Sequence, residues 1–291
     1  MSDNNLKEAI KHGTIQFPLA FYTHNLSEEP LFVSHHWHEE VELIYIEEGE
    51  VELEINMEKI EVKKNTFYFS NSEELHYLVG KPPIRESAIV FDLRLLSFEM
   101  FDYGQNNIIK PLLTGEIKFP RSIDGSTTYG KEIYKEFINI INAYSFKEIA
   151  WYIHIKASLL KILAILVENN LLINASNSTQ NNNNYKVMII KNILSYIQNN
   201  YKNKIYIKDL SSLANMNEQY LCRFFKKAIG KTVTDYINEY RIEKAVELLQ
   251  NKDIKILEIC LECGYDNVGY FIKKFKEYKS CTPSEYRKEI I

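Results

Sequence analysis

The chain has 291 residues and a mass of 34.3 kDa, so a prior of about 150 residues per domain predicts two domains. Hydrophobic residues make up 45% and charged residues 25% of the sequence, with only 10 Gly and 7 Pro, and this composition excludes fibrous and low-complexity proteins. Charged residues interrupt even the most apolar stretch, 149–173, which excludes a membrane span of about 20 apolar residues. The N-terminal MSDNNLKEAIKHG lacks the apolar core of a secretory signal, so we expect a cytoplasmic protein with no membrane partner.

An Asn-rich run, ASNSTQNNNN (175–184), separates two parts of opposite charge. Residues 1–184 carry 16 basic and 26 acidic side chains, a net charge of −10, whereas residues 185–291 carry 19 basic and 13 acidic side chains, a net charge of +6. A polar, uncharged run cannot bury enough apolar area to offset its ordering entropy, so it is typical of a flexible linker. The sequence therefore predicts a linker at 175–184 between an acidic and a basic domain.

Alternating apolar residues after Glu40 predict that the acidic part begins as an all-β domain. Val41, Leu43 and Tyr45 share one face of the first clear strand, and Gly49 marks a turn. Further strands are expected at 51–55, 60–62 and 67–69. Short strands at this spacing are typical of an antiparallel sandwich or barrel.

Four polar side chains lie beside these strands: His36, His38, Glu42 and His76. The spacing H-x-H-x3-E-x6-G, which ends at Gly49, together with a later His resembles the two motifs of the cupin superfamily over residues 15–95. The resemblance implies a small jelly-roll barrel. In metal-binding cupins the matching residues hold a divalent ion, and imidazole and carboxylate ligands suit Zn, Fe, Mn or Ni.

The second motif departs from the cupin pattern, because Asn65, Asn71 and Glu73 stand where the family usually has Gly, Pro and Gly. A lasting metal site needs ligands fixed by a tight turn and by outer hydrogen bonds. We therefore expect His76 to be poorly aimed, and the barrel to hold no metal and no other cofactor. The four polar groups would instead orient an organic effector. Aromatic residues expected to line the site are Trp37, Tyr45 and Phe91, within a wider supply of Phe17, Phe21, Tyr22, Phe69 and Tyr77.

The apolar period lengthens from two to about 3.6 residues within 126–174. Residues 134–141 and 149–166 predict two amphipathic helices with a break at 142–147. The second stripe is wide enough to cover the barrel and still face a second copy, which favours dimerisation through residues 151–167 with Leu159 and Leu163 at the contact. The alternative is that this helix only caps the barrel. We assign residues 1–125 to a sensory domain and 126–174 to a helical dimerisation segment.

The basic part contains an internal repeat. At an offset of 50 residues the like pairs include Asn217/Asn267, Tyr220/Tyr270, Phe225/Phe275, Thr232/Thr282 and Tyr236/Tyr286. Each copy is typical of a helix-turn-helix unit, with a turn at Asn215 or Gly264 and an Asn that can cap the second helix. The units are predicted at about 208–229 and 256–279, joined by a helix from Thr234 to Gln250.

The two copies resemble the AraC/XylS family of transcriptional regulators over the last hundred residues. The matching stretches are NEQYLCRFFKKAIGKTVTDYINEYRI from Asn217 and GYDNVGYFIKKFKEYKSCTPSEYR from Gly264. Gly269 and Ser280 depart from the family, which usually has a polar or larger residue and a Gly there. The resemblance implies that residues 185–291 bind double-stranded DNA with two recognition helices in successive major-groove segments. It also admits RNA polymerase as a further partner.

Basic side chains on the recognition helices are expected to contact phosphates, and residues in the first half of each helix to read bases. The expected DNA contacts are Gln219, Cys222, Arg223, Lys226 and Lys227 in the first unit, and Val268, Tyr270, Lys273, Lys274 and Lys276 in the second. Any single lysine could equally be a solvated surface charge. Cys260 and Cys263 have C-x2-C spacing, but no second ligand pair has suitable spacing, so we expect them to be core residues.

Together these patterns predict an α+β protein, a cupin-like jelly-roll barrel with flanking helices followed by an all-α double helix-turn-helix domain. The predicted function is transcription regulation by a DNA-binding homodimer without catalytic residues, controlled by a small-molecule effector such as a sugar or another metabolite. The alternative is a metal-dependent cupin enzyme fused to a DNA-binding domain, which bound metal and turnover would favour. A regulator controlled by a protein partner alone is a third hypothesis.

Overall fold

The computed structural model describes residues 12–175 and 181–289. The chain forms two compact units, and the boundary between them lies between Asn184 and Tyr185. Of the predicted linker, residues 176–180 lie outside the described residues, whereas residues 181–184 are helical and begin α4 (Asn181–Asn200). Among the described helices, none is both long and apolar enough to cross a membrane.

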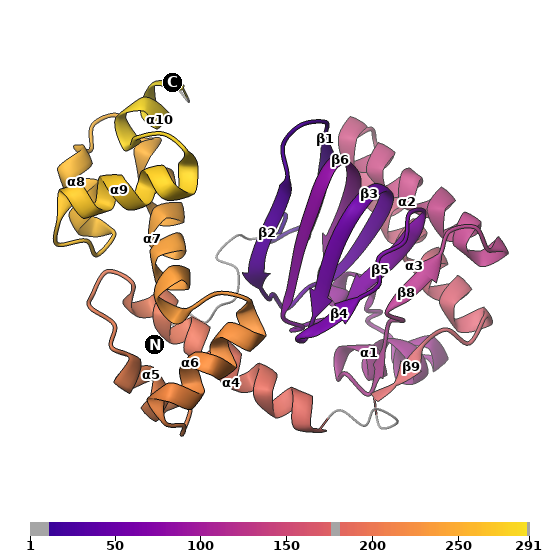
Figure 1. Ribbon diagram of the computed structural model, residues 1–291. Coiled ribbons are helices and arrows are strands. Elements are labelled where there is room, and N and C mark those ends of the chain that lie inside the picture. Colours follow the sequence, from indigo (N-terminus) through magenta and orange to yellow (C-terminus); the bar gives the residue numbers. More distant parts are fainter. Residues whose placement is uncertain (1–11, 176–180, 290–291) are drawn as a thin grey trace. The chain divides into compact units, whose positions relative to one another are not determined.

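A curved antiparallel sheet forms the first unit (Figure 1). Its strands are β1 (Leu19–Leu26), β2 (Leu31–His36), β3 (Val41–Ile55), β4 (Glu58–Ile60), β5 (Thr66–Ser70), β6 (His76–Phe91) and β8 (Ser122–Asp124). The long strands β3 and β6 pair with each other, and each changes its second partner along its length, β3 from β5 to β4 and β6 from β2 to β1. The exchange of partners curls the sheet around its inner face into the predicted cupin-like barrel.

Gly49 bends β3 and does not end it, so the predicted turn there is wrong. The register between β3 and β6 shifts on both sides of Glu48, which is the mark of a β-bulge. Gly49 has a φ of +122°, and a Cβ on it would lie 2.9 Å from the carbonyl oxygen of Pro83. A glycine is needed because the bulge brings the backbones of the two strands too close for a side chain.

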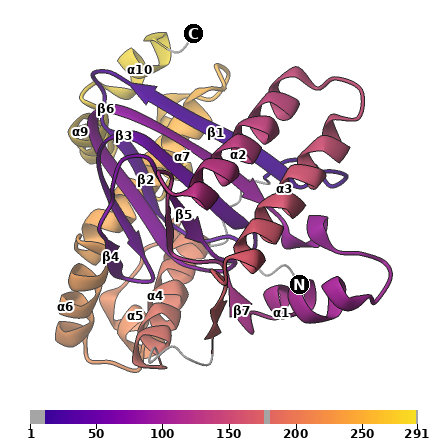
Figure 2. The ribbon, with the colours of Figure 1, turned by 90° about the vertical axis from the view of Figure 1, so that its right-hand side faces the viewer.

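Both faces of the first half of β3 are buried. Val41, Leu43 and Tyr45 share one face, as predicted. It is the outer face of the barrel, and the three side chains pack in a core with α2 (Thr128–Phe146) and α3 (Trp151–Glu168). Ile44 and Ile46 point to the inner face and join a second core inside the barrel. Figures 1 and 2 show α2 and α3 side by side against one face of the sheet. Helix α2 runs through the predicted break at 142–147 as far as Phe146.

Helix α3 covers the barrel with the residues that were expected to form a dimer contact. Leu159 is 3% exposed and Leu163 is 5% exposed, and both belong to the core beneath the helix. The prediction that they contact a second copy is therefore wrong, because the widest apolar stripe of the helix is needed to cover the sheet. Shorter elements complete the unit: η1 (Leu93–Leu96), η2 (Gln105–Ile109), α1 (Lys110–Leu113), and the paired strands β7 (Ile117–Lys118) and β9 (Ile173–Asn174).

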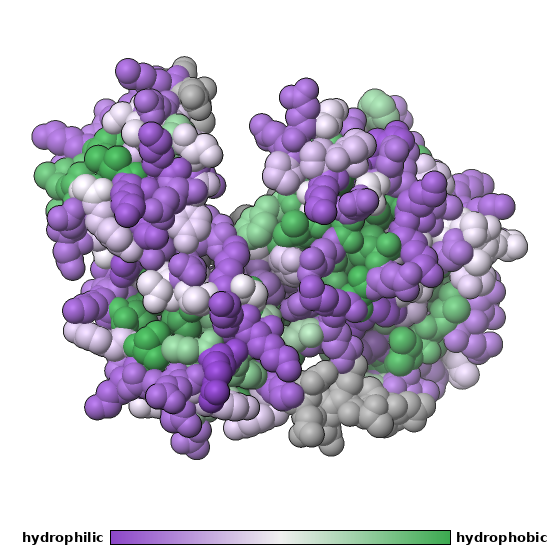
Figure 3. All heavy atoms as spheres, viewed as in Figure 1, coloured by the Kyte–Doolittle hydropathy of each residue, from purple (hydrophilic) through white to green (hydrophobic). Residues whose placement is uncertain are grey.

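The second unit is helical and confirms both predicted helix-turn-helix units. After α4 it contains α5 (Ile207–Leu213), α6 (Glu218–Ile229), α7 (Val233–Leu249), α8 (Ile256–Glu262), α9 (Val268–Lys279) and α10 (Pro283–Glu289). The turns have positive φ at Asn215 and Gly264, and the caps form as predicted, since Asn217 accepts a hydrogen bond from the Tyr220 amide at 2.8 Å and Asn267 does so from Tyr270 at 2.9 Å. Cys260 and Cys263 are fully buried. In Figure 3 hydrophilic side chains cover most of this unit in the view shown.

Candidate functional site

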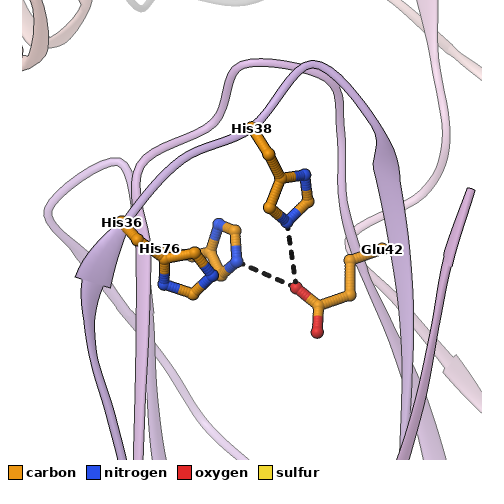
Figure 4. Close-up of side chains that lie close together, drawn as sticks. All are labelled: His36, His38, Glu42 and His76. Atoms are coloured by element: carbon orange, nitrogen blue, oxygen red, sulfur yellow. Dashed lines mark ion pairs between the residues drawn. The ribbon is translucent and has the colours of Figure 1, made fainter. Parts of the chain in front are cut away.

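The predicted His and Glu residues meet inside the barrel (Figure 4). His36 ends β2, His38 follows it, Glu42 lies in β3 and His76 begins β6. Each offers a ligand atom, and these atoms all lie within 4.8 Å of one another. The Nε2 atoms of His76 and His38 lie 2.8 Å and 3.5 Å from Oε2 of Glu42. Glu42 pairs with the far end of β6, at Val90, so it reaches His76 across the inside of the curled sheet.

All three imidazoles are held through Nδ1 by a backbone carbonyl. The Nδ1–O distances are 2.8 Å from His36 to Ser34, 3.0 Å from His38 to Glu40, and 2.8 Å from His76 to Glu74. A carbonyl oxygen can only accept a hydrogen bond, so each Nδ1 carries a proton. The Nε2 of each neutral ring is then an unprotonated acceptor, which is the tautomer of a metal ligand held by an outer carbonyl.

Three acceptor atoms in this cluster have no hydrogen bond of adequate geometry: Nε2 of His38, Nε2 of His76 and Oε2 of Glu42. Burial alone raises the pKa of Glu42, but the adjacent imidazoles of His38 and His76 outweigh it and hold that pKa well below its usual value. The carboxylate is therefore ionised. A proton on Nε2 of His38 or His76 would make these contacts ion pairs with Glu42, and the set of imidazoles and one carboxylate is also chemically suited to a divalent transition metal.

The expectation that His76 is poorly aimed is wrong. Asn65 and Glu73 adopt positive φ values of 54° and 61°, so they form the left-handed turns for which the cupin pattern uses glycine. Asn71 ties the same loop to Phe119, whose amide donates to Oδ1 at 2.8 Å. The left-handed turns and this long-range hydrogen bond thus take the place of the missing turn residues and leave His76 in place.

The cluster lies at one side of a cavity of about 120 Å³ inside the barrel. Apart from the cluster, the lining residues are His12, Tyr22, His24, Val33, Ile44, Leu78, Glu86, Ala88 and Val90. Sequence reasoning named Tyr22 only as part of the aromatic supply, and missed His12, His24 and Glu86. The strand pairing of His24 with Glu86 joins residues 62 positions apart, and no local signal in the sequence reveals it.

Trp37, Tyr45 and Phe91 were expected to line the site, and the structure places none of them among the cavity residues. Tyr45 and Phe91 lie in the core beneath the helices, because side chains alternate along a strand and Glu42 and Val90 take the inner face. The Tyr45 hydroxyl donates to Asn65 at 2.8 Å. Trp37 is buried outside the cavity.

His24 and Glu86 form a pair within the cavity, with Nδ1 and Oε2 2.7 Å apart. The hydrogen bond that His24 donates to Glu86 raises the pKa of His24 despite partial burial. Burial raises the pKa of Glu86, and the contact with His24 opposes it without cancelling it. Both polar groups therefore already have a partner.

The predicted DNA contacts lie on α6 and α9. The side chains of Gln219, Cys222, Arg223, Lys226, Lys227, Tyr270, Lys273 and Lys276 are exposed. Val268 instead packs partly buried against the core of its helix-turn-helix unit, and Lys274 is half-buried in an ion pair with Glu277 at 2.7 Å. These two are the least available of the predicted contacts. The position equivalent to Gln219 in α9 is Gly269, which offers no side chain.

Comparison with known proteins agrees with this division. Residues 210–289 match a family model described as a helix-turn-helix domain, and residues 25–82 match a cupin domain model. An uncharacterized HTH-type transcriptional regulator of Bacillus subtilis, YdeC, is 28% identical over 98% of this chain and 97% of its own. YdiP of Escherichia coli, described in the same words, is 26% identical over 90% of this chain and 84% of its own.

Among solved structures, the C-terminal domain of the response regulator yesN from Fusobacterium nucleatum is 36% identical and covers 33% of this chain and 93% of that chain, with a TM-score of 0.32. The two matched domains, the paired helix-turn-helix units and the regulators that are similar over nearly the whole chain all agree. The chain thus combines a region similar to cupin domains with a region similar to helix-turn-helix domains, and relatives that are similar over most of its length are named HTH-type transcriptional regulators.

Proposed function

We propose that an effector bound inside the barrel controls how this transcriptional regulator binds DNA. The observation that supports effector control is the cluster of His36, His38, Glu42 and His76 beside the cavity, in which Nε2 of His38, Nε2 of His76 and Oε2 of Glu42 have no hydrogen bond of adequate geometry. An unsatisfied buried polar group costs about 1–3 kcal/mol, so a stable domain keeps several of them together where they bind something. The similarity of the chain to proteins named HTH-type transcriptional regulators supports a role on DNA. We propose that the protein plays this role in the cytoplasm, without catalysis and with RNA polymerase as a further partner.

Effector control is tested with the full chain and a duplex selected from a random pool. Its affinity is measured with a panel of sugars, other metabolites and metal ions. An effector that distinguishes two states of a protein typically changes affinity about 5–150-fold. If the chain binds the duplex equally well with every compound and ion, effector control is refuted.

We further propose that α6 and α9 enter the major groove, with Arg223 reading a base and Lys226 contacting a phosphate. Arg223→Ala should cost about 1–3 kcal/mol at one base pair, whereas Lys226→Ala should weaken binding to all sequences and reduce the salt slope by about one. Lys252→Ala, a change of another exposed lysine outside the two recognition helices, is the matched control. An unchanged slope for Lys226→Ala would contradict this assignment.

Dimerisation is proposed through the outer side of α3. Ile153, Ala157, Leu160, Ala164 and Val167 alternate at spacings of four and three residues, and none of them is fully buried. This spacing is that of a coiled-coil seam, and Ile153 is 57% exposed. The helix would then contact the barrel with one side and a second copy with the other.

Ile153→Glu should give monomers in analytical ultracentrifugation while the fold is kept. Ile149→Glu makes the same chemical change at a residue that is 98% exposed and precedes α3, so it should leave the dimer intact. Leu159→Glu should instead unfold the barrel unit, because that side chain is in the core. A folded dimer of Ile153→Glu would argue against this surface.

A further inference from the structure

We infer that a groove between α2 and α3, on the outer side of the barrel unit, binds a linear organic amine. The groove has a volume of about 610 Å³, which lies within the range of about 300–1,000 Å³ that is usual for organic ligands. The barrel cavity has a volume of about 120 Å³, and the two share no lining residue. The inference therefore concerns a second site and goes beyond the proposed control by an effector in the barrel.

Facing stripes of the two helices form the groove, and Figure 2 shows these helices side by side. The lining residues lie within 136–146 on α2 and within 151–161 on α3, at helical spacings of three and four. At a rise of about 1.5 Å per residue, each stripe is about 15 Å long. The small side chains of Ala143 and Ala157 lie between the ends, so the groove suits a long, narrow ligand. Apart from Ala157, it shares no residue with the proposed dimer surface.

The half-buried carboxylate of Glu136 lies toward one end of the groove. The hydroxyl of Ser158, which is 7% exposed, donates to Oε2 of Glu136 at 2.7 Å, and the side-chain amide of Asn139 donates to the same oxygen at 3.1 Å. Both donors are neutral, so they hold the carboxylate in place and leave its charge uncompensated. Within the described ranges, no cationic side chain pairs with Glu136. A ligand ammonium would supply the missing charge-assisted hydrogen bond.

The other end of the groove is aromatic. Trp151 and Phe146 line it, together with the carboxylate of Glu148. The ammonium of Lys147 lies 5.7 Å from the centroid of the Trp151 ring and 5.2 Å from that of Tyr144. Aromatic faces attract cations within about 6 Å, and this contact shows which charge the corner accepts. Both ends of the groove therefore favour a positive group, with small residues between them.

The charge of the unit favours a cationic ligand over an anionic one. Residues 1–184 carry a net charge of −10, and a negative surface raises the local concentration of cations. In the groove itself, Glu136 and Glu148 outnumber the single lysine, Lys161. Lys161 pairs with neither glutamate in the part of the chain that the structure describes. Its charge opposes an amine and would assist an acid, so this residue distinguishes the two ligand classes.

The test uses the full chain without DNA, titrated calorimetrically at physiological salt so that exposed charges are screened. The probe is 1,8-diaminooctane, a linear molecule with an ammonium at each end. Octanedioate has the same chain length with a carboxylate at each end, and is the matched control compound. We expect saturable binding of one diamine per chain, with a change in the fluorescence of Trp151, and no saturable binding of octanedioate.

Four variants locate the site. Glu136→Gln keeps an acceptor for Ser158 but removes the charge, and should weaken diamine binding about 10–150-fold, which is the contribution of a hydrogen bond to a charged group. Glu132→Gln removes the same charge from an exposed residue of α2 outside the groove, and should leave binding unchanged. Lys161→Met should tighten binding. Glu148→Gln changes an exposed residue between the helices, should weaken binding, and decides the question if Glu136→Gln does not fold.

Several results would overturn the inference. These are a diamine that does not bind saturably, tighter binding of octanedioate than of the diamine, and a weaker affinity in Lys161→Met. Equal losses in Glu136→Gln and Glu132→Gln would show a general attraction to the acidic unit and no site. An unchanged fluorescence of Trp151 at saturation would place the ligand elsewhere. Effector control in the barrel is judged separately, because its test measures affinity for DNA.

Discussion

Gly264 and Gly230 provide a matched pair of alanine substitutions in the helical unit. Each ends the helix before it with a φ of +77°, so alanine at either position carries a similar cost of about 1–2 kcal/mol for the left-handed conformation. Their surroundings differ. A Cβ on Gly230 would meet nothing within 4 Å, whereas a Cβ on Gly264 would lie 2.3 Å from the carbonyl oxygen of Tyr201.

That carbonyl is held in place, because Arg241 donates to it at 2.8 Å. Relief of the clash therefore requires a shift of the backbone after α4 or the loss of this hydrogen bond. Overpacking of this kind costs about 1–3 kcal/mol more. We expect Gly264→Ala to lower the free energy of unfolding by about 2–5 kcal/mol, and Gly230→Ala by about 1–2 kcal/mol.

Urea denaturation followed by far-UV circular dichroism measures the loss. Trp37 and Trp151 both lie in the barrel unit, so their fluorescence serves as an internal control and should give the same midpoint in both variants. The reasoning would be refuted if the two alanine variants were equally destabilised, because the close approach of Gly264 to Tyr201 would then add nothing to the loss in the free energy of unfolding.

Three further outcomes are expected. Burial raises the pKa of Glu243 from 4.5 to about 7, so the stability tied to its protonated form is complete below pH 4.5 and is lost as the pH rises through 7; Glu243→Gln should match the parent chain at low pH and exceed its stability above pH 7 by at most about 3 kcal/mol, measured by urea titration at several pH values. Arg121→Ala removes the closest cation from the buried carboxylate of Glu74, 2.6 Å away, and should cost about 3–5 kcal/mol by tryptophan fluorescence. Asn267→Ala removes the cap of α9 and should cost about 1 kcal/mol, seen as a lower melting temperature; no loss would show that the cap is dispensable.

The helical unit could be predicted almost completely from the sequence because its signals are local. Asn217 and Asn267 lie within three residues of the amides that they cap. Because the unit is repeated, each local signal occurs twice in the sequence. The barrel was predicted as a class but not in detail. Gly49 gave the same signal for a bulge as for a turn, and only the pairing of β3 with the whole of β6 distinguishes the two.

The candidate site divides in the same way. The motif identified His36, His38, Glu42 and His76, because their spacing in the sequence matches the cupin pattern. The orientation of His76 depends on the left-handed backbone conformations of Asn65 and Glu73. A glycine at these positions would have predicted that conformation, whereas Asn and Glu do not. Tyr45 was assigned to the site because it is aromatic and close to Glu42, but at a separation of three residues a strand places the two on opposite faces.

Because both faces of β3 are buried, this strand connects the cavity directly to the core beneath the helices. Glu42 points into the cavity, and the next residue, Leu43, points into the core beneath α2 and α3. Close-packed interiors have low compressibility, so a movement of this strand by the cluster cannot be absorbed between the two layers. The cavity and the inner side of α3 are thus separated by the thickness of a single strand, and adjacent residues of one backbone connect the cavity with the helix.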